Sequence, residues 1–175
     1  MRIALYGFMG AGKSSLGQKL AQKLGYDFID LDTEIEAYTG KTINEIFESE
    51  SEIAFRKVEH LVLKNFIKQN LDNMVLALGG GSILQPTNRK LLELRNFYKI
   101  YINVDIAVLT ERLKTQREQR PLLKDLKEND FNDYVKALFE SRKQIYEKHA
   151  DLNFKVGHEN FETSLARLHN YLNLN

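Results

Sequence analysis

Apolar residues follow two alternating patterns along this chain, short continuous runs and helical spacings. The continuous runs indicate five buried strands, at residues 2–6, 28–30, 74–78, 98–104 and 152–156. Spacings of three and four predict helices between them, of which the first covers residues 14–24 and ends at Gly25. Strands that alternate with helices form a parallel sheet covered by helices. We therefore expect an α/β fold with a five-stranded parallel sheet.

A long helical interval separates the second predicted strand from the third. Between residues 32 and 70, apolar side chains recur at helical spacing, at Ile43, Ile46, Phe47, Phe55, Val58, Leu61, Val62 and Phe66. The sequence has no internal repeat, no low-complexity tract and no linker rich in proline or glycine. We expect a single domain over residues 1–175, into which the helical region at about 32–70 is inserted.

Composition narrows the class of protein further. The 175 residues are 43% hydrophobic and 28% charged, which fits one compact domain, and 25 Lys and Arg against 24 Asp and Glu leave a net charge of +1. A nearly neutral chain has no overall field that favours nucleic acid or an anionic membrane, so we expect neither as a partner. Cysteine is absent from the sequence, which excludes disulfides and thiolate metal sites and agrees with a reducing compartment.

Targeting and membrane signals are also missing from the sequence. No apolar run approaches the roughly 18 residues that span a bilayer, and the first residues lack a basic region followed by an apolar core. We expect a soluble, unprocessed, cytoplasmic chain, and we take a monomer as the working assumption.

The segment Gly7-Phe8-Met9-Gly10-Ala11-Gly12-Lys13-Ser14 has the spacing G-x-x-x-x-G-K-S of a P-loop, between the first predicted strand and the first helix. Its glycines let the main chain turn so tightly that successive N–H groups face one phosphate-sized concavity. Lys13 can then reach the β- and γ-phosphates, and Ser14 can offer its hydroxyl to Mg²⁺. The alternative is a glycine-rich turn that binds nothing, which the strand before it and the helix after it disfavour.

Two carboxylates follow the second predicted strand. In a sheet of this kind, ligands bind at the carboxyl ends of the strands. The strand ends in Asp30-Leu31-Asp32, and a period of two puts both aspartates on one side of an extended backbone. One can hold Mg²⁺ through water while the other orients or deprotonates a substrate hydroxyl. The alternative is a surface turn whose aspartates cap the next helix.

The third predicted strand ends in three glycines, Gly79, Gly80 and Gly81. Without side chains, this segment lets a small substrate approach and leaves main-chain N–H groups as donors. The alternative is a flexible strand exit without a ligand.

Positive charge is concentrated after the fourth predicted strand, in a segment that contains Arg112, Arg117 and Arg120. Such a run is usually the solvated face of a helix, but Pro121 disfavours helix at Arg120 and favours an extended loop there. A loop that carries arginine beside a P-loop is typical of a lid, which stabilises the transferring phosphoryl group and excludes water. We place this lid at about residues 112–128.

Two further arginines suit an acidic small molecule. Arg56 lies in the inserted region, and Arg142 lies between the lid and the last strand. A guanidinium fork donates two parallel hydrogen bonds to a carboxylate, and Glu59 at i+3 can fix the rotamer of Arg56. The alternative, for each arginine considered alone, is a surface residue in a helical salt bridge.

Together these motifs resemble the shikimate kinase family. The matching segments span residues 2–156, and they are GFMGAGKS at 7–14, DLDTEIE at 30–36, TGKTINEIFE at 39–48, FRKVE at 55–59, GGG at 79–81, RPLL at 120–123 and the segment 142–146. The resemblance implies a P-loop NTPase-type three-layer sandwich with strand order 2-3-1-4-5, a helical substrate-binding insertion and a lid. It also implies transfer of the γ-phosphoryl group of ATP to the 3-hydroxyl of shikimate, on the route to chorismate and the aromatic amino acids.

The same resemblance assigns roles to individual residues. It implies that ATP is bound by Gly10, Ala11, Gly12, Lys13, Ser14, Ser15 and Arg120. It implies one Mg²⁺ per subunit, at Ser14 and, through water, at Asp30. Shikimate is expected to contact Asp32, Arg56, Gly80 and Arg142, with the two arginines on its carboxylate and the Gly80 main chain on its ring hydroxyls. Lys13, Asp32 and Arg120 are the expected catalytic residues, with Asp32 as the base.

Some positions depart from the family pattern. Ser51 stands where a glycine is expected, so the local turn can differ. Leu113 replaces a lid arginine, so we assign no adenine contact to Arg112. Lys155 and His158 stand where the family often offers an arginine to the adenine, so we assign no adenine contact to residues 155–160 either. We interpret His158 as a surface residue outside the site.

Two other functions fit part of the pattern. A kinase of another small metabolite, such as gluconate or a nucleotide, would share the P-loop and the sheet but should lack the two-arginine clamp beside Asp32. A GTPase switch needs N-K-x-D and D-x-x-G motifs, which the sequence does not contain. A degenerate nucleotide sensor would be expected to lose Lys13, Asp32 or Arg120, and all three are present.

Overall fold

The structure, a computed structural model, describes residues 1–69, 71–157 and 159–173. Its sheet has five parallel strands in the order β2-β3-β1-β4-β5. The strands are β1 (Arg2–Tyr6), β2 (Asp27–Asp30), β3 (Met74–Ala77), β4 (Phe97–Val104) and β5 (Leu152–Val156). The expected parallel sheet and its strand order are confirmed.

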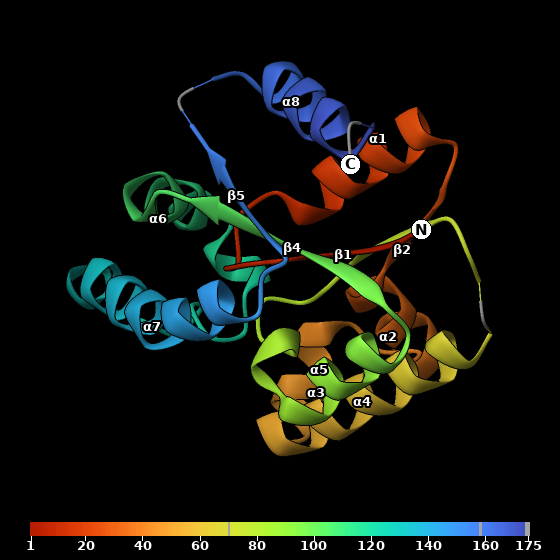
Figure 1. Ribbon diagram of the computed structural model, residues 1–175. Helices are drawn as coiled ribbons and strands as arrows, with labels where there is room; N and C mark the ends of the chain where they lie inside the picture. The colour runs from red at the N-terminus through yellow and green to blue at the C-terminus, as the bar shows by residue number, and fades with distance from the viewer. Residues whose placement is uncertain (70, 158, 174–175) are drawn as a thin grey trace.

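Helices cover both faces of the sheet and complete a three-layer sandwich (Figure 1). On one face, α1 (Lys13–Leu24) packs beside α8 (Phe161–Asn173). The other face carries α4 (Glu52–Lys68), α5 (Pro86–Leu94) and α7 (Glu128–Lys148). No helix in the described ranges is long and apolar enough to cross a membrane.

The central strand β1 explains the continuous apolar runs of the sequence. Its residues Ile3, Ala4, Leu5 and Tyr6 are fully buried, because helices cover both faces of the sheet. Helix α1 packs closely against one face of this sheet. A Cβ atom added at Gly17 would lie 2.7 Å from the ring of Phe28 on β2 and 3.1 Å from the Leu5 side chain, so a larger residue here would displace these side chains.

Three helices occupy the interval between β2 and β3. They are α2 (Leu31–Thr39), α3 (Ile43–Ser49) and α4, as the helical spacing predicted. Ser51 begins α4 by accepting a hydrogen bond from the Ala54 N–H at 3.2 Å, so the serine at this unusual position serves as an N-cap. Asn70, the predicted end of the insertion, lies outside the described residues.

The remaining connections bring functional segments to one edge of the sheet. A short 3₁₀ helix, η1 (Ser82–Leu84), follows the glycines after β3, and α6 (Ile106–Thr115) follows β4. Residues 116–127 connect α6 to α7 and include the 3₁₀ turn η2 (Arg117–Gln119). Since all strands are parallel, the segments that follow β1, β2 and β3 meet at the carboxyl edge.

Candidate active site

The P-loop connects β1 to α1 with a main chain that only glycine adopts readily. Gly10 has φ of 78°, and Gly12, the N-cap of α1, has φ of 82°. A Cβ atom at Gly7 would lie 2.6 Å from the Ile102 carbonyl oxygen, so this glycine is required by the close approach of β4. The loop therefore has the tight turn that the glycine spacing predicted.

Lys13 extends its side chain back over this loop. Its ammonium group donates hydrogen bonds to the carbonyl oxygens of Gly7 at 3.2 Å and Phe8 at 3.1 Å. The pKa of Lys13 is lowered to about 8, chiefly by burial; the charge of Asp32 opposes this shift, the cation of Arg120 adds to it, and Asp30 opposes it. A partly buried cation at the mouth of this loop favours an anionic ligand there.

Asp30 caps helix α2 and also contacts the P-loop. One carboxylate oxygen accepts hydrogen bonds from the N–H groups of Asp32 at 3.0 Å and Thr33 at 3.4 Å. The other accepts the hydroxyl proton of Ser14 at 2.5 Å. The expectation that Asp30 and Asp32 alternate along one extended strand is wrong, since β2 ends at Asp30 and α2 begins at Leu31. The cap favours this geometry because its oxygen satisfies otherwise unpaired N–H groups of the first helical turn.

Asp32 lies in the first turn of α2, in a crowded part of the cleft. Burial raises the pKa of Asp32 to about 6, Asp30 and Glu59 raise it as well, and Lys13 and Arg120 oppose the shift. A Cβ atom at Gly79 would lie 2.8 Å from one Asp32 oxygen, so the glycine allows the carboxylate to lie against the end of β3. A carboxylate with a pKa near neutrality is suited to accept a proton.

Two cavities meet at Asp32. The first is lined by the loop and lid residues Gly10, Gly12, Lys13, Ser14, Ser15, Asp30, Asp32, Gly80, Arg112 and Arg120, among others. The second is lined by Asp32, Phe55, Arg56, Glu59, Gly79, Gly80, Gly81, Arg120 and Arg142, among others. The structure thus places every predicted site residue except Ala11 at one or both cavities. Ala11 is buried, and its N–H donates to the Phe8 carbonyl oxygen at 3.3 Å.

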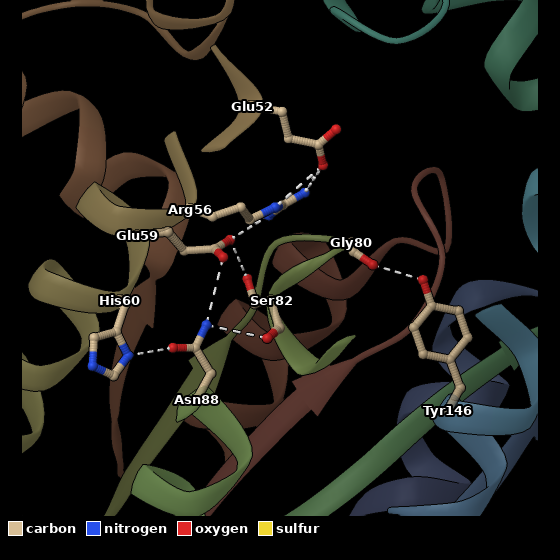
Figure 2. A network of polar contacts seen from close by, with 8 residues as sticks. All are labelled: Glu52, Arg56, Glu59, His60, Gly80, Ser82, Asn88 and Tyr146. Atoms are coloured by element: carbon tan, nitrogen blue, oxygen red, sulfur yellow. Dashed lines mark hydrogen bonds and ion pairs between the residues drawn. The ribbon is translucent and has the colours of Figure 1, made fainter. Parts of the chain in front are cut away.

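The second cavity contains two guanidinium groups on different helices. Arg56, on α4, is held by Glu59 at 2.9 Å and by the half-exposed Glu52 at 3.2 Å (Figure 2). Arg142, on α7, is 9% exposed, with its guanidinium carbon 5.9 Å from the ring centre of Phe8. None of the ion pairs among the described residues includes Arg142. A buried cation without a carboxylate partner favours an acidic ligand.

A buried polar network holds Arg56 through Glu59. Glu59 is the one member of this network that the sequence analysis identified. The Glu59 side chain is fully buried and accepts hydrogen bonds from the Ser82 hydroxyl at 2.6 Å and the Asn88 amide at 3.5 Å (Figure 2). The same amide nitrogen donates to the Ser82 carbonyl at 3.1 Å, so the Asn88 oxygen accepts from His60 Nδ1 at 2.8 Å. Ser82 and Asn88 lie more than 20 residues beyond Glu59, and no sequence pattern joined them to it.

The segment between α6 and α7 covers both cavities. Arg120 has the extended conformation that Pro121 predicted, with φ of −123° and ψ of 107°. Its Nη2 donates to Gln116 Oε1 at 3.3 Å, and its buried Nε has no partner in the described part of the chain. Arg112 donates to the Gly10 carbonyl at 3.2 Å and therefore lies beside the P-loop. Arg117 instead pairs with Glu128 at 3.0 Å.

This segment also contacts the inserted helices. Asn44 on α3 donates to the Glu118 carbonyl oxygen at 3.2 Å, and Lys124 forms an ion pair with Glu48 of the same helix. The insertion and the arginine-bearing loop thus close around the cavities from two sides. Lys155 is exposed, and His158 lies outside the described residues.

Comparisons with known proteins agree with this geometry. A sequence model of the family "Shikimate kinase" matches residues 9–173. A shikimate kinase of Flavobacterium psychrophilum is 39% identical over 140 residues, which are 79% of this chain and 81% of that protein. The crystal structure of shikimate kinase from Bacteroides thetaiotaomicron superposes with a TM-score of 0.87 at 33% identity, covering 99% of this chain and 98% of that one.

A second solved structure was determined with a ligand. Shikimate kinase from Acinetobacter baumannii, in complex with shikimate, superposes with a TM-score of 0.85 at 32% identity over 99% of this chain and 93% of that one. The family match and the two structural similarities extend over nearly the whole sequence. By sequence and by fold, this chain belongs to the shikimate kinase family.

Proposed function

We propose that the two cavities transfer the γ-phosphoryl group of ATP to the 3-hydroxyl of shikimate, one cavity for each substrate. ATP-dependent phosphorylation of shikimate is the activity of the family, and this chain is a kinase of that kind in the route to the aromatic amino acids. One observation carries the assignment of residues: Asp32 lines both cavities, so the anion-binding loop and the two-arginine pocket open onto one carboxylate.

The P-loop side is assigned to the nucleotide. The main chain of the P-loop and the Lys13 ammonium are proposed to hold the phosphates, since Gly10 and residues 12–15 line the first cavity. Ser14 and Asp30 are proposed to hold one Mg²⁺, with Asp30 acting through water. Their oxygens already lie 2.5 Å apart, and Mg²⁺ prefers one or two protein oxygens together with phosphate and water. Bound Mg²⁺ would neutralise the charge that develops on the phosphates.

The other cavity is assigned to shikimate. Arg56 and Arg142 are proposed to bind its carboxylate, because both guanidinium groups line this cavity and Arg142 has no ion pair among the described residues. The main chain of Gly80 is proposed to contact the ring hydroxyls. Asp32 would then accept the proton of the 3-hydroxyl as the new O–P bond forms, a role that its raised pKa supports.

Arg120, in the segment between α6 and α7, is proposed to bind the phosphates. It lines both cavities, and its unpartnered Nε suits a phosphate oxygen. We propose residues 112–128 as the lid, which excludes water when both substrates are bound. Within the proposed single domain, residues 32–70 form the acceptor-binding insertion. A cytoplasmic location and a monomeric state remain predictions from the sequence.

A coupled assay of ADP release tests this function. The purified chain with MgATP should release ADP when shikimate is added, and neither gluconate nor a nucleoside monophosphate should replace it. Arg142→Ala should raise the KM for shikimate about 30-fold or more, because the substrate carboxylate loses a desolvated partner, while the KM for ATP stays within about twofold. ADP release that does not depend on shikimate would contradict the proposed function.

A further inference from the structure

Tyr146 connects α7 to the glycine segment that follows β3. Its side chain is fully buried, and its hydroxyl donates a hydrogen bond of 2.6 Å to the Gly80 carbonyl oxygen (Figure 2). The hydroxyl of Tyr6 in turn donates to the main-chain carbonyl of Tyr146 at 2.8 Å. The ring of Tyr146 packs against those of Tyr101 and Tyr6, with centroids 5.3 Å and 6.2 Å away. These contacts hold the Tyr146 hydroxyl in one position.

The bond to Gly80 also orients the next N–H group. In a planar trans peptide, the carbonyl of one residue and the N–H of the following residue point in opposite directions. A carbonyl of Gly80 that is directed at Tyr146 therefore directs the Gly81 N–H to the opposite side. None of the hydrogen bonds among the described residues uses this N–H. A peptide between two glycines rotates easily, so an external bond is needed to hold it in one orientation.

Gly81 adjoins the proposed clamp for the substrate carboxylate. A Cβ atom at Gly81 would lie 2.3 Å from Arg56 Nη2, so the Gly81 main chain lies directly against that guanidinium. Gly80 and Gly81 both line the cavity of Arg56 and Arg142. The residue whose N–H Tyr146 orients thus lines the acceptor cavity.

The same bond sets the position of α7 relative to β3. Arg142 and Tyr146 are four residues apart on α7, so they share one face of the helix, and both are buried. Holding Tyr146 at Gly80 therefore holds Arg142 at a constant distance from the glycine segment. α7 directly follows the arginine-bearing loop, whose movement would otherwise displace the helix.

We propose that Tyr146 is a positioning residue for the acceptor: its hydroxyl holds the Gly80 carbonyl, and in this way orients the Gly81 N–H and aligns Arg142 with it. The proposal rests on the proposed function, since it assumes that this cavity takes shikimate. The Gly81 N–H then donates to an oxygen of the bound acceptor.

The chemistry of the tyrosine supports this role. Burial raises the pKa of Tyr146 to about 12, against the opposing effect of the nearby cations Arg142 and Arg56. The hydroxyl therefore remains protonated, and remains a donor to Gly80, throughout the pH range in which the enzyme would work.

Tyr146→Phe tests the proposal, with Tyr101→Phe as the matched control. Both residues are buried in one stack of rings, but only Tyr146 donates to the glycine segment. Tyr146→Phe should raise the KM for shikimate about tenfold, since a buried carbonyl loses its donor and the acceptor loses an oriented N–H, and should leave the KM for ATP within about twofold. Tyr101→Phe should change neither constant by more than about twofold.

Other results would overturn the proposal. An unchanged KM for shikimate in Tyr146→Phe would remove the positioning role, and an equal rise in both KM values would reduce Tyr146 to a structural residue. Wild-type protein in the same assay distinguishes the role of Tyr146 from the proposed function. If the wild type phosphorylates shikimate and Tyr146→Phe has unchanged constants, only the role of Tyr146 is contradicted. An inactive wild type overturns both.

Wild-type protein also carries the test if Tyr146→Phe does not fold. Amide hydrogen exchange, followed by NMR, should show the Gly81 N–H unprotected in the free protein and protected on addition of shikimate. Exchange at Gly81 that shikimate does not slow would overturn the proposal.

Discussion

Asp32→Asn should produce a protein that is more stable than the wild type but almost inactive. The substitution preserves the size of the side chain and removes only the charge that the cleft disfavours. The turnover number should fall by about two to four orders of magnitude, because the proposed base is lost. The stability should rise, because the folded state no longer has to contain an ionised carboxylate at this position.

The size of the gain in stability follows from the pKa of Asp32, which is about 6 in the folded protein against 3.8 in the unfolded chain. At 1.36 kcal/mol per unit, ionised Asp32 destabilises the fold by about 3 kcal/mol at pH 7.5. Because the folded pKa is the higher one, this destabilisation is small below about pH 4, develops between about pH 4 and pH 6, and is fully present above that range. For a chain of this size, removal of this destabilisation corresponds to a rise of about 5–10 °C in Tm for the variant.

Differential scanning calorimetry at pH 7.5 and pH 4.5 measures this difference, with Asp30→Asn as the control. Asparagine is as good an N-cap as aspartate, so the control should change the Tm by only about 1–2 °C. The gain for Asp32→Asn should be large at pH 7.5 and small at pH 4.5. A Tm at pH 7.5 equal to or below that of the wild type would refute the electrostatic account of Asp32.

Two further predictions concern charge in the cleft. The value of kcat/KM for MgATP, corrected for the ionisation of ATP, should rise through about pH 6 as Asp32 loses its proton. It should fall above about pH 8 as Lys13 loses its charge. A flat profile from pH 5 to pH 9 would contradict both assignments. Glu59→Gln should raise the KM for shikimate about tenfold or more, because a buried partner of Arg56 loses its charge. Glu52→Gln should change this KM by less than about threefold, because the Glu52 carboxylate is half-exposed. Equal effects of the two substitutions would show that the buried network does not position Arg56.

Local signals in the sequence predicted the elements correctly wherever one local cause was decisive. The apolar runs were clearest for β1 and β3, because a sheet covered on both faces leaves no exposed position on its central strands. Pro121 predicted the extended conformation of Arg120 because proline disfavours the helical conformation of the preceding residue. At Asp30-Leu31-Asp32, two local preferences competed, and the helix cap prevailed over the continued strand.

Tertiary contacts decided what no local signal contained. Glu59 appeared in the sequence as a helical neighbour of Arg56, but its complete burial and its bonds to Ser82 and Asn88 depend on packing α4 against the segment after β3. Tyr146 likewise appeared as one residue of a matching segment, and only the fold placed its hydroxyl on the Gly80 carbonyl, 66 residues away along the chain.

The sequence by itself determined the phosphate loop, the order of strands and helices, and the kinds of charged group that the site would contain. These features depend on backbone sterics, on periodicity and on side-chain chemistry, which act within a few residues. The tertiary structure decided which of those groups meet. Asp32 faces both cavities, and the two arginines share one of them, because a parallel sheet brings the ends of distant strands to a single edge.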